Sequence, residues 1–102
     1  MEKGILLHEA DDDVGVAAMD LKAGEDVQAV TLEGNPITPI KLIDDIPLGH
    51  KVAMHDIEKK KNIIEYGRPI GYATVEIAAG AHVHVHNIKS LRWAGESQIV
   101  EH

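Results

Sequence analysis

The apolar residues of the chain fall in short runs that Gly, Pro and polar residues interrupt. The longest stretch without such breaks lies between His50 and Tyr66, and there residues 58–62 form a polar gap without helical spacing. Short aliphatic runs bounded by turn residues predict strands. The predicted strands cover residues 5–8, 15–19, 27–32, 38–42, 51–54, 62–66, 70–73 and 81–87.

One local pattern, which we call the turn motif, recurs four times between these runs. An acidic residue precedes an aliphatic one, and a Gly stands three positions after the aliphatic residue, except in the third copy, which has Lys60. We expect the acid to cap a single helical turn, the aliphatic residue to pack in the core, and Gly to supply positive φ. The irregular spacing of the copies argues against a solenoid repeat. The copies begin at Asp20-Leu21, Asp45-Ile46, Asp56-Ile57 and Glu76-Ile77, with glycines at Gly24, Gly49 and Gly80.

A length of 102 residues suits a single domain. The chain has no Phe, one Trp and two Tyr, so its core must consist of aliphatic residues, many of them β-branched. We therefore predict an all-β domain of short strands and tight turns over residues 1–93. Residues 94–102 continue no strand pattern and are expected to form a flexible tail.

The charge and the absent motifs exclude several function classes. A net charge of -7 disfavours nucleic acid as a partner, and the absence of Cys removes thiolate sites and disulfides. There is no signal-peptide core and no apolar run of a membrane helix, so we expect a cytoplasmic protein without a membrane partner. Because no phosphate loop, nucleophile elbow or zinc-protease motif occurs, catalysis by this chain alone is not expected.

Three histidines alternate in the predicted strand 81–87. This spacing places His82, His84 and His86 on one face and turns Val83 and Val85 into the core. Alternate residues of a strand are ~6.6 Å apart, so two of these imidazoles can converge on one cation. The alternative is a polar strand face at a subunit contact.

A metal site at His82 and His84 would need further ligands from other parts of the chain or from a partner. Within the chain, His50, His55 and Asp56 are the candidates.

Two other segments could hold an anionic substrate. His50 and Lys51 follow Gly49 on a turn that opens a strand, although a solvated turn is the simpler interpretation. Arg68 carries a guanidinium that matches a carboxylate; the alternative is that the glycines around it only shape a kink. Residues 11–13 are acidic and are interpreted as solvated local caps without a function.

Several of these segments together resemble the N-terminal SAF domain of the altronate and galactarate dehydratase family, over about residues 5–93. They are Asp13-Val14-Gly15-Val16-Ala17, Gly49-His50-Lys51-Val52-Ala53, Asp56-Ile57, Tyr66-Gly67-Arg68-Pro69-Ile70-Gly71-Tyr72-Ala73 and His82-Val83-His84-Val85-His86-Asn87. The resemblance implies a β-clip fold and the loss of water from a hydroxy sugar acid.

The catalytic body of such enzymes is a larger second portion. The resemblance therefore implies a small accessory subunit that works with a large catalytic subunit, which would hold most of a divalent metal of the iron or manganese type. The small subunit of sulfolactate sulfo-lyases is also similar, at residues 86–89 and 92–93. The choice between cleavage of a C–O and a C–S bond stays open.

The resemblance also suggests roles for single residues. His84 and His86 are expected to face the cleft of the large subunit, where imidazole binds substrate or relays a proton. His50, Lys51 and Asn87 match the family's motifs and, with Arg68, are expected to bind substrate. Two other classes remain: a non-catalytic module that binds a sugar acid or a metal, and a homo-oligomer in which the histidine face only packs.

Overall fold

The computed structural model describes residues 3–90, which form nine short strands and no α-helix, so the all-β prediction is confirmed. Within this range no helix is long and apolar enough to cross a membrane. The predicted domain end at residue 93 and the predicted tail 94–102 lie outside the described residues. The strands are β1 (Lys3–Leu7), β2 (Val14–Ala17), β3 (Asp26–Thr31), β4 (Pro36–Lys41), β5 (Lys51–Ala53), β6 (Asn62–Glu65), β7 (Arg68–Ala73), β8 (His82–Val83) and β9 (Ile88–Ser90).

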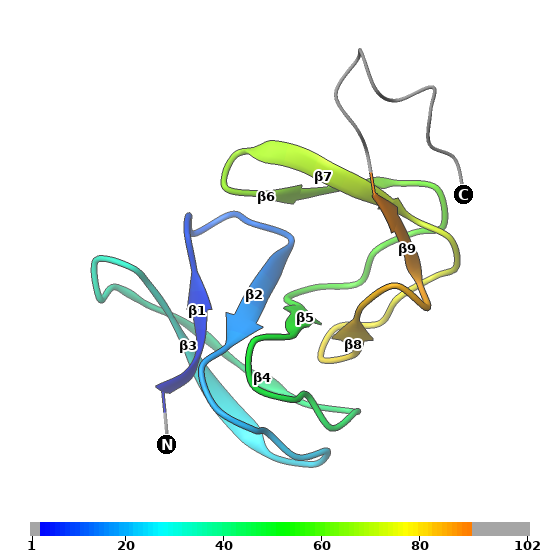
Figure 1. The fold of residues 1–102 in the computed structure, drawn as a ribbon. Helices are drawn as coiled ribbons and strands as arrows, with labels where there is room; N and C mark the ends of the chain where they lie inside the picture. The colour runs from blue at the N-terminus through cyan, green and yellow to red at the C-terminus, as the bar shows by residue number, and fades with distance from the viewer. Residues whose placement is uncertain (1–2, 91–102) are drawn as a thin grey trace.

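The strands form two sheets (Figure 1). The larger sheet has the order β4-β3-β1-β2-β5-β8, and the smaller has the order β6-β7-β9. Only β1 and β3 pair in parallel, while the other neighbours are antiparallel. The first seven predicted strands coincide with β1 to β7, and their ends agree within two residues.

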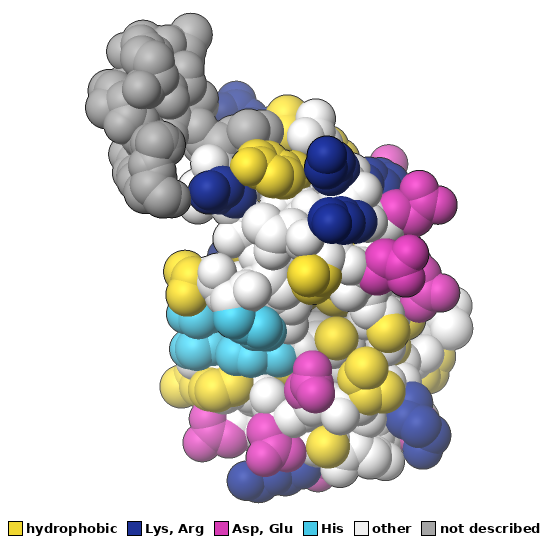
Figure 2. Space-filling view, turned by 90° about the vertical axis from the view of Figure 1, so that its right-hand side faces the viewer, with side chains coloured by type: hydrophobic (Ala, Val, Ile, Leu, Met, Phe, Trp, Pro, Cys, Tyr) yellow, Lys and Arg dark blue, Asp and Glu magenta, His cyan; other side chains and the backbone are white. Residues whose placement is uncertain are grey.

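The predicted histidine strand is wrong beyond its third residue. β8 ends at Val83, residues 84–87 form a turn, and β9 then joins the smaller sheet. Val83 is buried, with 1% of its surface exposed, but Val85 is 80% exposed and does not enter the core. The strand stops because the Asn87 side chain accepts the His84 N–H and donates to the His82 carbonyl. Histidine side chains nevertheless gather in one patch on the surface of the molecule (Figure 2).

All four turn motifs form tight β-turns. In each, the third residue has positive φ, as a type II turn requires, at Gly24, Gly49, Lys60 and Gly80. The N–H of the fourth residue donates to the carbonyl of the first, over residues 22–25, 47–50, 58–61 and 78–81. The positive φ expected at the three glycines is thus confirmed, and Lys60 in the third motif also has positive φ, whereas the expected helical turn is wrong.

The three aspartates of the turn motifs cap a different turn from their own. Asp20 accepts the N–H of Leu48, and Asp45 accepts the N–H of Ala23, so the first two motifs cap each other. Asp56 accepts the N–H of Ala79 in the fourth motif. The expected cap within one turn is therefore wrong, because the acid reaches across to a partner motif.

Backbone hydrogen bonds join the same motif pairs. Leu21 and Ile46 exchange two N–H to carbonyl bonds of 2.8 and 2.9 Å, and Ile57 and Ile77 exchange two of 2.7 and 2.9 Å. All four aliphatic side chains are buried, as the motif predicts. Each pair is a small clip that fastens two distant loops.

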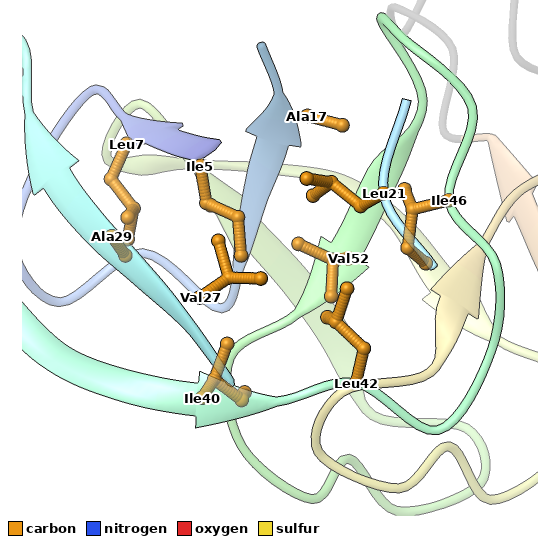
Figure 3. Close-up of a cluster of buried hydrophobic side chains, with 10 residues drawn as sticks. All are labelled: Ile5, Leu7, Ala17, Leu21, Val27, Ala29, Ile40, Leu42, Ile46 and Val52. Carbon is orange, nitrogen blue, oxygen red and sulfur yellow. The ribbon is translucent and has the colours of Figure 1, made fainter. Parts of the chain in front are cut away.

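The two clips sit in two separate hydrophobic clusters. Leu21 and Ile46 belong to the first cluster, which fills the inner side of the larger sheet (Figure 3). Ile57 and Ile77 belong to the second. The first cluster is Ile5, Leu7, Ala17, Leu21, Val27, Ala29, Ile40, Leu42, Ile46 and Val52, and the second is Val14, Ala53, Ile57, Ile63, Ala73, Ile77, Ala81 and Val83.

Two glycines of the turn motifs allow a matched test of this packing. Both have positive φ, but a Cβ on Gly80 would overlap the carbonyl oxygen of Lys41, whereas a Cβ on Gly24 would meet nothing within 4 Å. We expect Gly24→Ala to lower the free energy of unfolding by about 1 kcal/mol, for the backbone conformation alone. Gly80→Ala should lower it by about 3 kcal/mol or more, because the overlap adds to that cost. Equilibrium denaturation in urea measures both, and equal losses would contradict the turn packing.

Candidate functional site

The side chains of His50, His82, His84 and His86 form one cluster, which we call the histidine group. His50 ends the second turn motif and directly precedes β5. β5 pairs antiparallel with β8, so that Val52 lies opposite His82 and Lys51 opposite Val83. Side chains opposite each other share a face of the sheet, and His50 stands two residues before Val52, so it lies on the same side as His82. The turn 84–87 then adds His84 and His86.

The imidazoles of the histidine group stack closely. His50 Nδ1 lies 2.8 Å from His82 Nε2. The ring centroid of His84 is 4.4 Å from that of His50 and 5.6 Å from that of His82. The His86 ring is tilted, with its centroid 5.2 Å from that of His82. In Figure 2 the histidines form one continuous patch, bordered above and below by hydrophobic side chains.

Two side chains hold the backbone of this group in place. Asp44 accepts the His82 N–H at 2.9 Å. Asn87 is buried. Its side-chain oxygen accepts the His84 N–H at 2.9 Å, and its side-chain nitrogen donates to the His82 carbonyl at 2.8 Å. The Asn87 side chain was expected to bind substrate. Its oxygen and nitrogen instead bond the backbone, so Asn87 positions the histidines. The role of Asp44 was missed, since nothing in the sequence distinguishes it from the neighbouring Asp45 of the turn motif.

Burial lowers the pKa of His82 below its usual value, and the nearby imidazoles of His50, His86 and His84 lower that pKa further. The Asp44 carboxylate acts in the opposite direction and has the smallest effect. The neutral form of the His82 imidazole is therefore favoured near neutral pH, and only that form has a nitrogen lone pair free to bind a metal or a proton.

The histidine group could hold a metal ion. Ligand atoms of His50, His82 and His84 all lie within 4.8 Å of one another. His50, His55 and Asp56 were the candidates for further ligands. Of these, the structure places His50 beside His82 and His84. His55 instead lies 2.6 Å from Asp13 through its Nε2, and Asp56 caps the fourth turn motif.

The other expected binding residues lie apart from the histidine group. Lys51 points to the opposite face of the sheet, where its Nζ is 3.8 Å from Glu65. Arg68 is exposed at the first position of β7, beside the hairpin turn of the smaller sheet (Figure 1). The structure therefore does not assemble His50, Lys51 and Arg68 into one anion site.

Two of the acids at residues 11–13 are buried, which corrects their interpretation as solvated caps. Asp12 accepts the N–H groups of Glu9 and Tyr66, and Asp13 accepts the N–H of Ile64 at 2.6 Å. These bonds tie the loop after β1 to β6 in the smaller sheet, so their role is structural.

Comparison with known proteins identifies relatives over nearly the whole chain. Residues 2–91 match the model of the altronate/galactarate dehydratase SAF domain. The (2R)-sulfolactate sulfo-lyase subunit alpha of Chromohalobacter salexigens is 35% identical over 94 residues. That alignment covers 91% of this chain and 100% of the relative.

Two altronate dehydratases also match, but over a small part of their length. The Escherichia coli enzyme is 46% identical over 79 residues, which are 78% of this chain and 15% of the enzyme. The Bacillus subtilis enzyme is 38% identical over 90 residues, which are 88% of this chain and 17% of the enzyme. In these dehydratases the matching region is thus one part of a much longer chain.

The positioning role of Asn87 can be tested by substitution. We expect Asn87→Ala to lower the free energy of unfolding by about 2 kcal/mol, because a backbone N–H and a carbonyl lose their partner. Val85→Ala, in the same turn, should change it by less than about 0.5 kcal/mol, since that side chain is exposed. Chemical denaturation compares the two variants. A loss for Val85→Ala as large as that for Asn87→Ala would indicate that Val85 is buried in the core and would contradict the turn at residues 84–87.

Proposed function

The chain belongs to the altronate/galactarate dehydratase SAF domain family, and from this membership we propose that it is the small subunit of a two-subunit lyase of the sulfolactate sulfo-lyase type. The membership confirms the resemblance that the sequence motifs indicated. One observation carries the proposal: the alignment with the sulfo-lyase subunit alpha extends over the whole of that relative.

The relatives also support a larger partner. The name subunit alpha implies at least one further subunit in that enzyme. In the altronate dehydratases the matching region makes up 15% and 17% of the chain, so most of each enzyme lies outside it. In our proposal, the large subunit provides the catalytic body that these dehydratases carry in the same polypeptide.

The surface around the histidine group suits a contact with such a subunit. Leu48 and Val85 are 62% and 80% exposed, and they lie within two residues of His50 and of His84. Large exposed apolar side chains gathered beside polar ones are typical of protein interfaces. We propose that the large subunit covers this surface and that the histidine group forms one wall of the shared active site.

The exposed imidazoles fit the chemistry of an elimination. Such a reaction removes the proton next to the substrate carboxylate and expels a leaving group from the neighbouring carbon. His84 and His86 are exposed, so an imidazole of either can bind the anionic substrate or transfer a proton. A divalent metal held by the large subunit would polarise the substrate oxygens. Sulfite leaves more readily than hydroxide, so a sulfo-lyase needs less acid assistance than a dehydratase.

A sugar-acid dehydratase is the second candidate. It is favoured by the 46% identity with the Escherichia coli altronate dehydratase, which exceeds the 35% identity with the sulfo-lyase subunit. Its substrate would be a hexonate or a related sugar acid, and the leaving group would be hydroxide. The two candidates share the carboxylate-activated elimination and differ in the bond that breaks.

Purification with the large subunit separates these candidates. We expect a stable complex that releases sulfite from (2R)-sulfolactate and does not dehydrate altronate or galactarate. His86→Gln should retain the complex and lower kcat about 100-fold, because a proton-transfer or substrate-binding group is lost. Lys22→Gln, on an exposed turn outside the histidine group, serves as the control and should keep full activity.

Three outcomes would contradict this account. Dehydration of a sugar acid without sulfite release would favour the second candidate. A complex that keeps full activity in His86→Gln would remove this imidazole from the active site. If no complex forms with any dehydratase-like large chain, both lyase proposals fail.

A further inference from the structure

We propose that His50, His82 and His84 bind one divalent transition-metal ion, in a site built entirely by this chain. The inference does not rest on the proposed function, since it needs no large subunit and no substrate. A metal site would use the backbone pairing, the turns and the buried polar contacts that together position the histidine group.

The distances between the donor atoms favour such a site. Metal–imidazole bonds of about 2.0 Å in a tetrahedral arrangement separate the nitrogens by about 3.3 Å. His50 Nδ1 and His82 Nε2 lie 2.8 Å apart in a hydrogen bond, which a metal would replace as the two nitrogens separate by about 0.5 Å. The three ligand atoms lie within 4.8 Å of one another. His84 is exposed, so a small rotation of its side chain can bring its nitrogen into range.

The ligands come from well-anchored backbone. His50 closes the turn 47–50, and the His82 N–H is held by Asp44. Asn87 holds the backbone on both sides of Val83. A site whose ligands are fixed before the metal arrives loses little entropy on binding.

The donor set indicates the class of metal. Three neutral imidazoles suit Zn²⁺, Co²⁺, Ni²⁺, Cu²⁺ and Fe²⁺, while Mg²⁺ and Ca²⁺ require oxygen ligands. Three protein ligands leave at least one coordination position open, as in catalytic rather than structural zinc sites. His84 and His86 are exposed, so this position opens toward the surface. There a carboxylate or hydroxyl oxygen of a hydroxy acid, or a side chain of a partner, can complete the coordination.

The test uses the full chain without a histidine tag, after treatment with EDTA. Calorimetry with ZnCl₂ should show one ion bound per chain. Addition of CoCl₂ should give the visible absorption bands of tetrahedral Co²⁺. His50→Gln and His84→Gln should each weaken Zn²⁺ binding by about tenfold or more and should abolish the cobalt bands.

His55→Gln is the matched control, because His55 is a partly exposed histidine outside the histidine group. It should leave Zn²⁺ affinity within about twofold of the parent chain, and MgCl₂ should give no heat. Circular dichroism establishes that each variant is folded before titration. No Zn²⁺ binding at millimolar concentration would overturn the proposal. Equal weakening by His55→Gln and His50→Gln would also overturn it, since binding would then be non-specific.

Discussion

The structure depends on the pairing of its turn motifs. Leu21 with Ile46, and Ile57 with Ile77, bring together loops that lie 25 and 20 residues apart in the sequence, and each pair is fastened by two backbone hydrogen bonds. The aliphatic side chains anchor the two pairs in separate hydrophobic clusters. With no Phe in the chain, these small clusters of Ile, Leu, Val and Ala provide the apolar burial that stabilises the domain.

The histidine group is a direct consequence of this pairing. His50 is the last residue of the turn around Gly49, and His82 follows two residues after Gly80. These turns belong to different clips, so the two histidines meet only when both clips are closed and β5 pairs with β8. Asp44 and Asn87 then fix the backbone on which His82 and His84 stand. The contacts that hold the fold together therefore also assemble the histidine group.

The sequence predicted the local features well and the long-range ones poorly. Aliphatic runs between turn residues indicated β1 to β7, and the glycines of the turn motifs indicated positive φ at Gly24, Gly49 and Gly80. The strand over residues 81–87 failed because a side-chain bond from Asn87 competes with the sheet, which alternation cannot reveal. The acid caps failed for a related reason, as Asp20, Asp45 and Asp56 each bond a turn 22 residues or more away. Likewise, the choice of His50 over His55 beside His82 depends on the register of β5 against β8.

The central claim is that three imidazoles from two distant segments of the chain form one metal-binding site. A crystal structure of the chain grown with CoCl₂, with data collected at the cobalt absorption edge, tests this claim most directly. The account predicts one strong anomalous peak at about 2.0–2.2 Å from nitrogens of His50, His82 and His84. A cobalt peak at another place on the described chain, with these three imidazoles unliganded, would contradict it.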